Sequence, residues 1–314
     1  MPDKPPKTAK LPDPILRVEC LVCYKPTIES SVYCERCRVP VQSHKIEKLK
    51  RRRAMINALD RLRDVFLCQL CHLPIDLVDQ SSYKWREFDH ITPIKTSELQ
   101  FLWAVFNQMK FELSDEEFKT LIIQLRDGWL GIPFDRSKVK FEYWSRNKTK
   151  PALLKKALGP IEDLRFGEKP TERCIICGDP SHPSSVYCPR CRMFFRTDHE
   201  CLERRKALKA AWDPVRRKFI CFYTGVELDD ADFEGPWSVS FDHGVPGKKG
   251  DLVVAALWVS LMKVDLARDE FYAVIKELAR VIETGDNFDE RVCRFLYWKR
   301  RKDGTRKLKL FPMV

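Results

Sequence analysis

The chain has 314 residues, a formal net charge of +12 and 44% hydrophobic residues. This composition excludes a disordered chain, and the length is enough for about two domains. The longest apolar run, at 253–259, is too short to cross a bilayer, and the N-terminus lacks the apolar core of a secretory signal. We therefore expect a cytoplasmic protein without a membrane partner, and the positive charge favours a polyanion such as nucleic acid.

The first element in the chain is a group of four cysteines with the spacing Cys-x2-Cys-x10-Cys-x2-Cys. Its members are Cys20, Cys23, Cys34 and Cys37. A two-residue gap lets one tight turn deliver two thiolates, and four thiolates complete the tetrahedral shell of a structural zinc ion. The absence of a secretory signal favours metal over disulfides. An iron–sulfur cluster is the chemical alternative.

A charged amphipathic helix is predicted next, over residues 44–66. Its apolar residues recur at helical spacing, at Ile46, Leu49, Ile56, Leu59, Leu62 and Phe66. Its basic residues are candidate phosphate contacts, and they include Lys50, Arg51, Arg52 and Arg53. Cys68 and Cys71 follow as a third pair that has no partner pair, and we interpret them as the relic of a zinc site.

A strand ending in the Asp-His pair at 89–90 is predicted after these cysteines. A turn, a short second strand and a helix carrying the sequence NQMK at 107–110 follow it. Ser114 and Glu117 have the spacing of a capping box, which predicts another helix that ends near Gly128.

The same series of motifs then occurs a second time, at an offset of 153 or 154 residues. The sequence FDH at 241–243 matches that at 88–90, and FLYWKR at 295–300 matches FEYWSR at 141–146. A near-constant offset over this length indicates the tandem duplication of a whole domain. We divide the chain into repeat one (1–146), a Lys- and Pro-rich linker (147–173) with a short helix near 152–158, and repeat two (174–314).

Repeat two contains a second cysteine group with the same spacing, formed by Cys174, Cys177, Cys188 and Cys191. Two structural zinc ions per chain are therefore predicted. The counterpart of the charged helix lies near 199–212 and brings Arg204 and Arg205 as further candidate nucleic-acid contacts. Of the third pair only Cys221 remains, because Thr224 replaces the second thiol. Cys201 and Cys293 have no partner at metal-ligand spacing, so we expect them in the core.

The Asp-His pair, the Pro three residues later and the helical Asn-x-x-Lys resemble the HNH endonuclease family, whose fold is the ββα-metal hairpin and helix. The resemblance covers about 45 residues of each repeat, roughly 68–110 and 221–263. It implies Asp89 and Asn107 as ligands of Mg²⁺ or another divalent ion, His90 as the general base and Lys110 as the motif lysine, which is also a candidate nucleic-acid contact. Imidazole is suited to taking a proton near neutral pH.

In repeat two the resemblance retains Asp242 as a ligand, His243 as the base and Lys263 as the motif lysine, again a candidate nucleic-acid contact. Ser260 stands where Asn107 does, and its hydroxyl is a poorer ligand for a hard cation than an amide oxygen. Repeat one therefore has the more complete site, and we expect repeat two to be weakened in cleavage.

The expected fold class is α+β, a tandem duplication of a zinc ribbon (20–38 and 174–192) and an HNH-like ββα-metal unit (66–128 and 219–285) with additional helices. The expected function is metal-dependent hydrolysis of phosphodiester bonds in DNA, with RNA as the alternative nucleic acid. The two repeats are expected to form an intramolecular pseudo-dimer.

The stretch from His90 to Asn107 is shorter than is usual for the family, which predicts a trimmed hairpin. Two features favour a different function: the intermediate Asn of the family is absent, with Glu98 and Asp251 at the nearest positions, and Ser260 replaces Asn107 in repeat two. The alternative is a non-catalytic, zinc-containing nucleic-acid-binding protein that retains the fold as a scaffold. A zinc-stapled protein-interaction module, without salt-dependent affinity for nucleic acid, is the third hypothesis.

Overall fold

The structure is a computed structural model that describes residues 19–28, 31–42, 47–94, 96–144, 171–183, 185–195, 201–230 and 235–298. The predicted linker helix near 152–158 lies outside these residues. The chain divides into two compact units, residues 1–66 and residues 67–314. Helices and two-stranded sheets both occur, so the α+β class is confirmed.

The first unit contains two helices and a short hairpin. Helix α1 spans Glu35–Gln42 and α2 spans Lys48–Ala58, and strands β1 (Leu59–Asp60) and β2 (Val65–Phe66) pair antiparallel. The predicted helix over 44–66 was therefore too long. The Asp60 carboxylate accepts hydrogen bonds from the backbone N–H groups of Leu62 and Arg63, and such Asx turns compete with the helix. Leu62, one of the apolar residues at helical spacing in the predicted helix, lies beyond α2 and is fully exposed.

The second unit begins with a hairpin followed by helices. Strands β3 (Arg86–His90) and β4 (Leu99–Trp103) pair antiparallel, with Asp89 opposite Gln100. Every residue of β4 is buried, and the strand leads directly into α3 (Ala104–Lys110). Helix α4 (Asp115–Trp129) begins at the predicted capping box, in which Ser114 and Glu117 cap each other's backbone. A 3₁₀ turn, η1, follows at Arg136–Lys138.

The same order of elements returns later in this unit. The elements are α6 (Pro189–Arg192), η3 (Met193–Phe195), α7 (Cys201–Ala211), β5 (Trp212–Asp213), β6 (Lys218–Phe219), β7 (Val239–His243), β8 (Leu252–Ala256), α8 (Leu257–Lys263), α9 (Arg268–Thr284) and η4 (Glu290–Val292). Strands β5 and β6 pair antiparallel, as do β7 and β8, with Asp242 opposite Val253. Each hairpin and its following helix lie 153 residues after their counterparts in repeat one.

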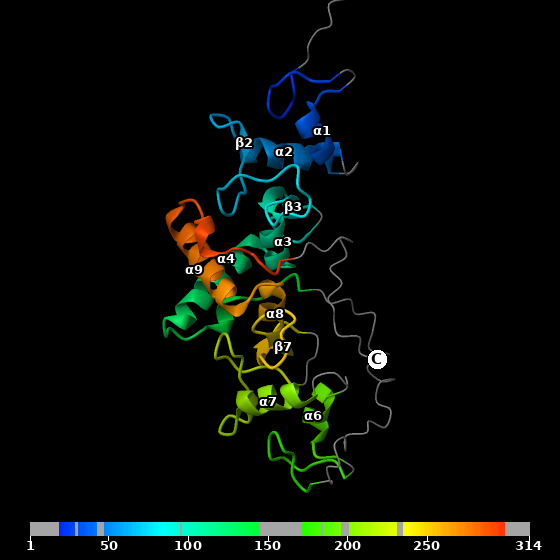
Figure 1. The fold of residues 1–314 in the computed structure, drawn as a ribbon, viewed down its shortest axis with the longest axis vertical. Coiled ribbons are helices and arrows are strands. Elements are labelled where there is room, and N and C mark those ends of the chain that lie inside the picture. Colours follow the sequence, from blue (N-terminus) through cyan, green and yellow to red (C-terminus); the bar gives the residue numbers. More distant parts are fainter. Residues whose placement is uncertain are drawn as a thin grey trace, which may run out of the picture. The chain divides into compact units, whose positions relative to one another are not determined.

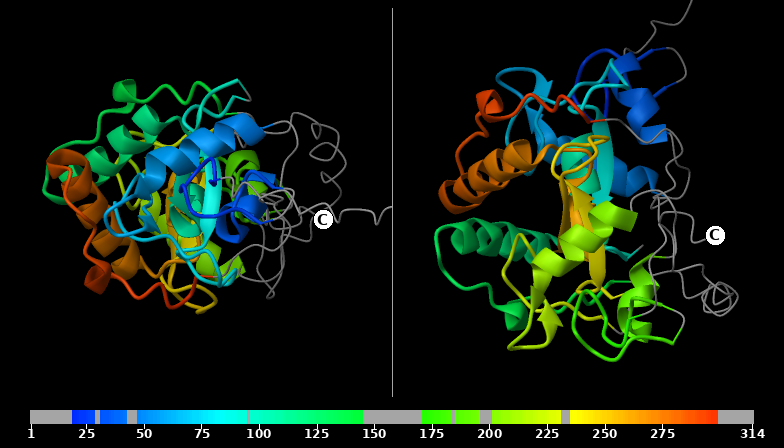
Figure 2. Two further views of the ribbon diagram at one scale, coloured as in Figure 1. Left: turned by 90° about the horizontal axis from the view of Figure 1, so that it is seen from above. Right: turned by 60° about the horizontal axis from the view of Figure 1, so that its bottom comes forward.

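The two hairpin-and-helix segments of this unit pack against each other through their helices. Helix α4 lies alongside α9, as Figures 1 and 2 show in green and orange, and α3 contacts α8. Arg126 of α4 forms an ion pair with Glu283 of α9, and the indole of Trp129 donates to the carbonyl of Tyr223. The two segments therefore share one core.

The segment after each long helix crosses to the other repeat. Phe141, which follows α4, packs edge-on against Trp237 with ring centroids 5.7 Å apart, and it also contacts Trp258. In return Phe288, which follows α9, packs on Phe106 at 5.6 Å and on Trp103 at 6.4 Å. Each hairpin-and-helix core is thus completed by aromatic side chains of the other repeat.

Candidate active site and zinc sites

The first cysteine group brings four sulfur atoms together in the first unit. The Sγ atoms of Cys20, Cys23, Cys34 and Cys37 all lie within 4.8 Å of one another. The Sγ of Cys23 lies 3.4 Å from that of Cys34 and 3.7 Å from that of Cys37. Four sulfurs at about 2.3 Å from one zinc ion are separated by similar distances. This set therefore fits a tetrahedral zinc ion.

The second group has the same geometry. The Sγ atoms of Cys174, Cys177, Cys188 and Cys191 also lie within 4.8 Å of one another. Burial raises the pKa of Cys177 to about 11, and hydrogen bonds to Cys174 and Cys188 raise the pKa of Cys191, whereas hydrogen bonds to Cys188 and Cys191 lower the pKa of Cys174. A bound cation compensates the charge of all four thiolates, so metal binding and the local fold are coupled.

The third pair keeps the turn of the zinc groups but not their ligand number. The N–H of Cys68 donates to the carbonyl of Leu73, just as the N–H of Cys20 donates to that of Lys25, both at 2.8 Å. The Sγ of Cys68 accepts a hydrogen bond from the backbone N–H of Trp103 at 3.4 Å. Among the described residues, Cys68 and Cys71 belong to no set of three or more His, Cys, Asp or Glu side chains with ligand atoms within 4.8 Å of one another, whereas each four-cysteine group forms such a set. Cys293 is buried, as predicted, and the side chain of Cys201 lies outside the described part.

Asp89 of β3 and Lys110 of α3 form a buried ion pair. Lys110 is 2% exposed, and its Nζ lies 2.6 Å from Asp89 Oδ2, 2.6 Å from the carbonyl of His90 and 3.0 Å from Asp115 Oδ1. Three acceptors match the three N–H donors of an ammonium group. Gln100, opposite Asp89 in the hairpin, donates to the same Oδ2 at 3.2 Å. Asp89 thus carries its negative charge beside a cation already inside the protein.

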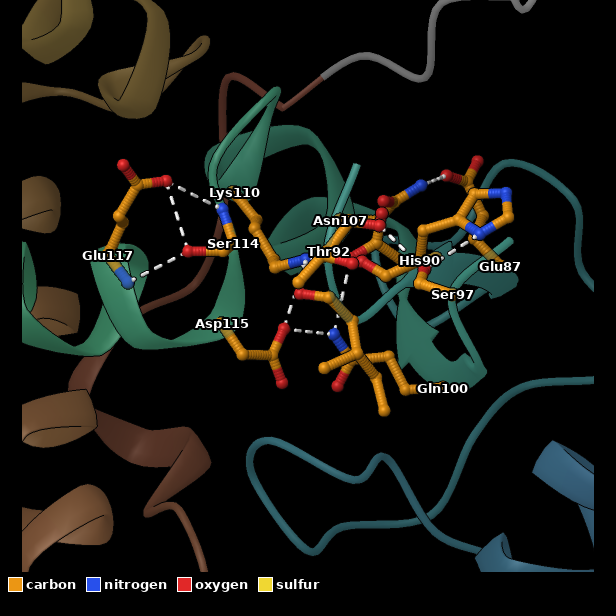
Figure 3. Close-up of polar contacts among 12 residues, drawn as sticks. Glu87, His90, Thr92, Ser97, Gln100, Asn107, Lys110, Ser114, Asp115 and Glu117 are labelled. Atoms are coloured by element: carbon orange, nitrogen blue, oxygen red, sulfur yellow. Dashed lines mark hydrogen bonds and ion pairs between the residues drawn. The ribbon is translucent and has the colours of Figure 1, made fainter. Parts of the chain in front are cut away.

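Asn107 lies beside a carboxylate that the motif did not include. Its Nδ2 donates a hydrogen bond to Glu87 of β3, as Figure 3 shows. Its Oδ1 is buried and has no hydrogen-bond partner. Side chains two residues apart on a strand share a face, so Glu87 and Asp89 both lie on the side of α3. The structure therefore brings two carboxylates and one amide oxygen to the contact between β3 and α3.

His90 contacts Ser97, which lies next to Glu98 in the sequence. Its Nδ1 lies 3.2 Å from Ser97 Oγ, and Ser97 donates its hydroxyl proton to the carbonyl of Thr92 at 2.6 Å (Figure 3). Because the hydroxyl proton of Ser97 is directed to Thr92, Ser97 Oγ can accept a hydrogen bond from the tautomer of His90 that carries its proton on Nδ1. A general base that acts through Nε2 requires this tautomer.

Repeat two arranges the same positions differently. Asp242 accepts a hydrogen bond from the hydroxyl of Tyr223, and its Oδ1 lies 3.3 Å from Nζ of Lys263. Burial raises the pKa of Asp242 and lowers that of Lys263, which is 1% exposed. Arg268 stands where repeat one has Asp115 and lowers the pKa of Lys263 further by repulsion.

Repeat two has smaller side chains at the positions of the oxygen-bearing residues around Asn107 and His90. Ser240 and Ser260 occupy the positions of Glu87 and Asn107, and Gly250 occupies that of Ser97. The Oγ of Ser260 is buried without a hydrogen-bond partner. Repeat two therefore offers one carboxylate where repeat one offers two, and it has no side chain at the position that supports His90.

The candidate nucleic-acid contacts differ in exposure. Lys110 and Lys263 are internal, and Arg204 is also buried, with its guanidinium 4.9 Å from the ring centre of Phe241. Each of these three cations contacts groups inside the protein, whereas a contact with a phosphate requires an exposed cation. Lys50, Arg51 and Arg52 of α2 are partly exposed, as is Arg205 of α7, and Arg53 is exposed.

Glu87, Ser97 and Tyr223 were missed by sequence reasoning. Glu87 was detectable in principle, because it lies two residues before Asp89 and therefore on the same strand face. Ser97 directly precedes Glu98, the position nearest to the missing Asn. Tyr223 had no signal, because its contact with Asp242 joins a loop and a strand that the motif does not relate.

No family model, curated protein or solved structure matches the chain. The resemblance to HNH endonucleases therefore rests on the motifs in this sequence. Among the described residues, no helix has both the length and the apolar character needed to cross a membrane.

Proposed function

We propose that the chain is a metal-dependent endonuclease that hydrolyses phosphodiester bonds in DNA, with its active site in repeat one. The observation that carries this proposal is the difference between the repeats around one common hairpin and helix. Repeat one has Glu87, Ser97 and Asn107 where repeat two has Ser240, Gly250 and Ser260. A scaffold role alone gives no reason to concentrate ligand and base-supporting side chains in one copy.

The side chains of repeat one fit a hard divalent cation. Glu87, Asp89 and Asn107 provide oxygen atoms, the ligand type that Mg²⁺ and Mn²⁺ prefer. The buried Oδ1 of Asn107 lacks a hydrogen-bond partner in the protein, and a cation satisfies such an atom. When bound, the ion supplies positive charge for the phosphate oxygens that become more negative during cleavage.

His90 supplies the general base in this proposal. With its proton held on Nδ1 by Ser97, its Nε2 accepts a proton from the attacking water. Lys110 Nζ donates a hydrogen bond to the backbone carbonyl of His90 at 2.6 Å and therefore fixes the end of β3. Lys110 is thus a positioning residue whose ammonium also balances the charge of Asp89.

The packing of α4 against α9 supports an intramolecular pseudo-dimer, in which the two repeats face a duplex together. Repeat two then contributes DNA contacts and little chemistry. The test is conversion of supercoiled plasmid to nicked and linear forms in Mg²⁺ or Mn²⁺. We expect His90→Ala to lower the rate roughly a hundredfold to ten-thousandfold and His243→Ala to have a much smaller effect. Undiminished cleavage by His90→Ala refutes this site.

A second function, nucleic-acid binding without cleavage, is favoured by one specific observation. In both repeats the aspartate of the Asp-His pair is paired with a buried lysine, Asp89 with Lys110 and Asp242 with Lys263. An internal ammonium group can replace a metal ion as the stabilising charge. Salt-dependent DNA binding with no nicking in either metal between about pH 6 and 9 selects this alternative.

A further inference from the structure

We propose that the tips of the two short hairpins, β1–β2 and β5–β6, each insert an apolar side chain into a groove of duplex DNA. The side chains are Leu62 in repeat one and Val215 in repeat two. This inference rests on the proposed nucleic-acid partner, but it does not depend on cleavage.

Both side chains are exposed at equivalent positions. Leu62 is 100% exposed and Val215 is 90% exposed, and they lie 153 residues apart in the sequence. Each is the second residue of a four-residue loop, 61–64 or 214–217, between strands of only two residues. Single exposed apolar residues are ordinary on protein surfaces. Here the same exposure recurs at the same place in both copies of the motif.

Each tip is held in a defined conformation. In repeat one Asp60 Oδ1 accepts from the backbone N–H of Leu62 at 3.0 Å and of Arg63 at 3.2 Å. In repeat two Asp213 Oδ1 accepts from the N–H of Val215 at 2.9 Å and of Arg216 at 3.1 Å. A tip that is already ordered loses little conformational entropy when it binds.

The cysteine groups anchor the far side of these loops. In the first unit Asp64 forms an ion pair with Lys25 and accepts from Arg36 at 3.0 Å, and both partners lie within the first cysteine group. In repeat two Arg217 pairs with Asp179, which lies within the second group. A zinc ion in each group therefore fixes the loop that presents the apolar side chain.

The positive charges around the two hairpin tips favour nucleic acid as the partner. Arg61 and Arg63 flank Leu62, and Arg216 and Arg217 follow Val215, and all four are exposed. One apolar side chain among guanidinium groups is too small for a protein interface, which needs a contiguous buried core. It matches a DNA groove, where cations contact phosphates on either side and an aliphatic wedge enters between base steps.

The chain contains a matched control for this arrangement. Val78 is 89% exposed, and it lies in the same type of turn, because Asp76 Oδ1 accepts from the N–H of Val78 at 2.8 Å and of Asp79 at 2.9 Å. Its flanking charges are acidic, so this tip is repelled by phosphates. Val78→Ser removes the same kind of exposed side chain without touching the proposed wedge.

The experiment measures binding of the full zinc-loaded chain to a mixed-sequence duplex of about 30 base pairs without added Mg²⁺. 2-Aminopurine in the duplex reports unstacking by its fluorescence. We expect the double variant Leu62→Ser/Val215→Ser to bind about tenfold more weakly and to lose the fluorescence increase, with an unchanged dependence of affinity on salt. Arg63→Ala should instead reduce the salt slope by about one. Val78→Ser should match the wild type.

Three results overturn the inference. If the wild type shows no salt-dependent binding to duplex DNA, this inference and the proposed partner both fail. If the wild type binds but the double variant has the same affinity and fluorescence, only the wedge fails. Equal weakening by Val78→Ser also refutes it, because the effect then has no link to the basic tips. Because all three apolar side chains are exposed, the melting temperature of each variant should equal that of the wild type.

Discussion

Lys25 forms an ion pair with Asp64 in the first unit, and the equivalent positions of repeat two carry the same pair with its charges exchanged, as Asp179 and Arg217. An attraction preserved through exchange of both charges indicates that the contact itself matters in each copy. In both cases it ties the hairpin loop to the turn of the cysteine group.

This pair predicts a charge-exchange experiment. Lys25→Asp should lower the melting temperature, because it places two carboxylates together, and Lys25→Asp/Asp64→Arg should restore it by copying repeat two. The hydrogen bond from Lys25 lowers the pKa of Asp64, so its stabilising contribution is present above about pH 4 and is lost as the pH falls through the lowered value. Thermal unfolding of the variants at pH 7 and at pH 3 measures both effects. Failure of the double variant to recover at pH 7 contradicts the pairing.

Metal content tests the cysteine groups. Elemental analysis should find two zinc ions per chain, and Cys34→Ser and Cys188→Ser should each remove one ion. Each loss should destabilise the hairpin anchored to that group, since metal binding and folding are linked. Cys293→Ser is the control, because this cysteine is buried outside both groups and should leave both ions in place. Iron with visible absorbance in place of zinc contradicts the assignment.

The exchange of aromatic side chains between the repeats predicts mutual dependence. Phe288→Ala should destabilise the second unit by about 3–5 kcal/mol, because it opens a cavity beside Trp103 and Phe106 in the other repeat. Leu296→Ala, at a nearby exposed position, should change the stability little. Chemical denaturation measures the difference. Separate unfolding transitions for the two hairpin-and-helix segments, or their independent motion in small-angle scattering, contradict a shared core.

Features that depend on residues close together in the sequence were predicted well, and those that depend on contacts between distant residues were not. The cysteine spacing, the Asp-His strand and the Ser114–Glu117 capping box are local patterns, and the structure contains each of them. The charged helix was predicted to be too long, because apolar residues continue at helical spacing up to Phe66 although the helix ends at Ala58 and the Asx turn at Asp60 follows.

Contacts between distant segments could not be predicted from the sequence. The motif does not indicate that Lys110 points inward and pairs with Asp89, since a helical lysine is ordinarily exposed. Nor does periodicity relate Phe288 to Trp103, because their meeting depends on how α4 and α9 pack. Such contacts follow from tertiary packing, which no local pattern encodes.

The contact between Asn107 and Glu87 predicts how repeat one holds its metal. Glu87→Ser, which copies repeat two, should raise the Mn²⁺ concentration needed for half-maximal plasmid cleavage about tenfold or more, because it removes a carboxylate and the hydrogen bond that orients Asn107. Glu87→Gln keeps an acceptor for Asn107 Nδ2 and should recover part of the loss. A role in folding alone predicts lower melting temperatures with an unchanged metal requirement, and that result contradicts the site.

The same contact can be transferred to repeat two. Ser240→Glu/Ser260→Asn places a carboxylate and an amide at the positions that Glu87 and Asn107 occupy in repeat one, beside the existing Asp242 and His243. If these side chains limit repeat two, the double variant should cleave in a His90→Ala background, where the parent does not. The hydroxyl of Tyr223 bonds Asp242 only in repeat two, so adding Tyr223→Phe should increase the gain by releasing that carboxylate. In an otherwise wild-type chain, two competent sites should raise the ratio of linear to nicked plasmid. Cleavage that stays absent in the triple variant, with zinc content and melting temperature preserved, shows that ligand loss does not account for the difference between the repeats.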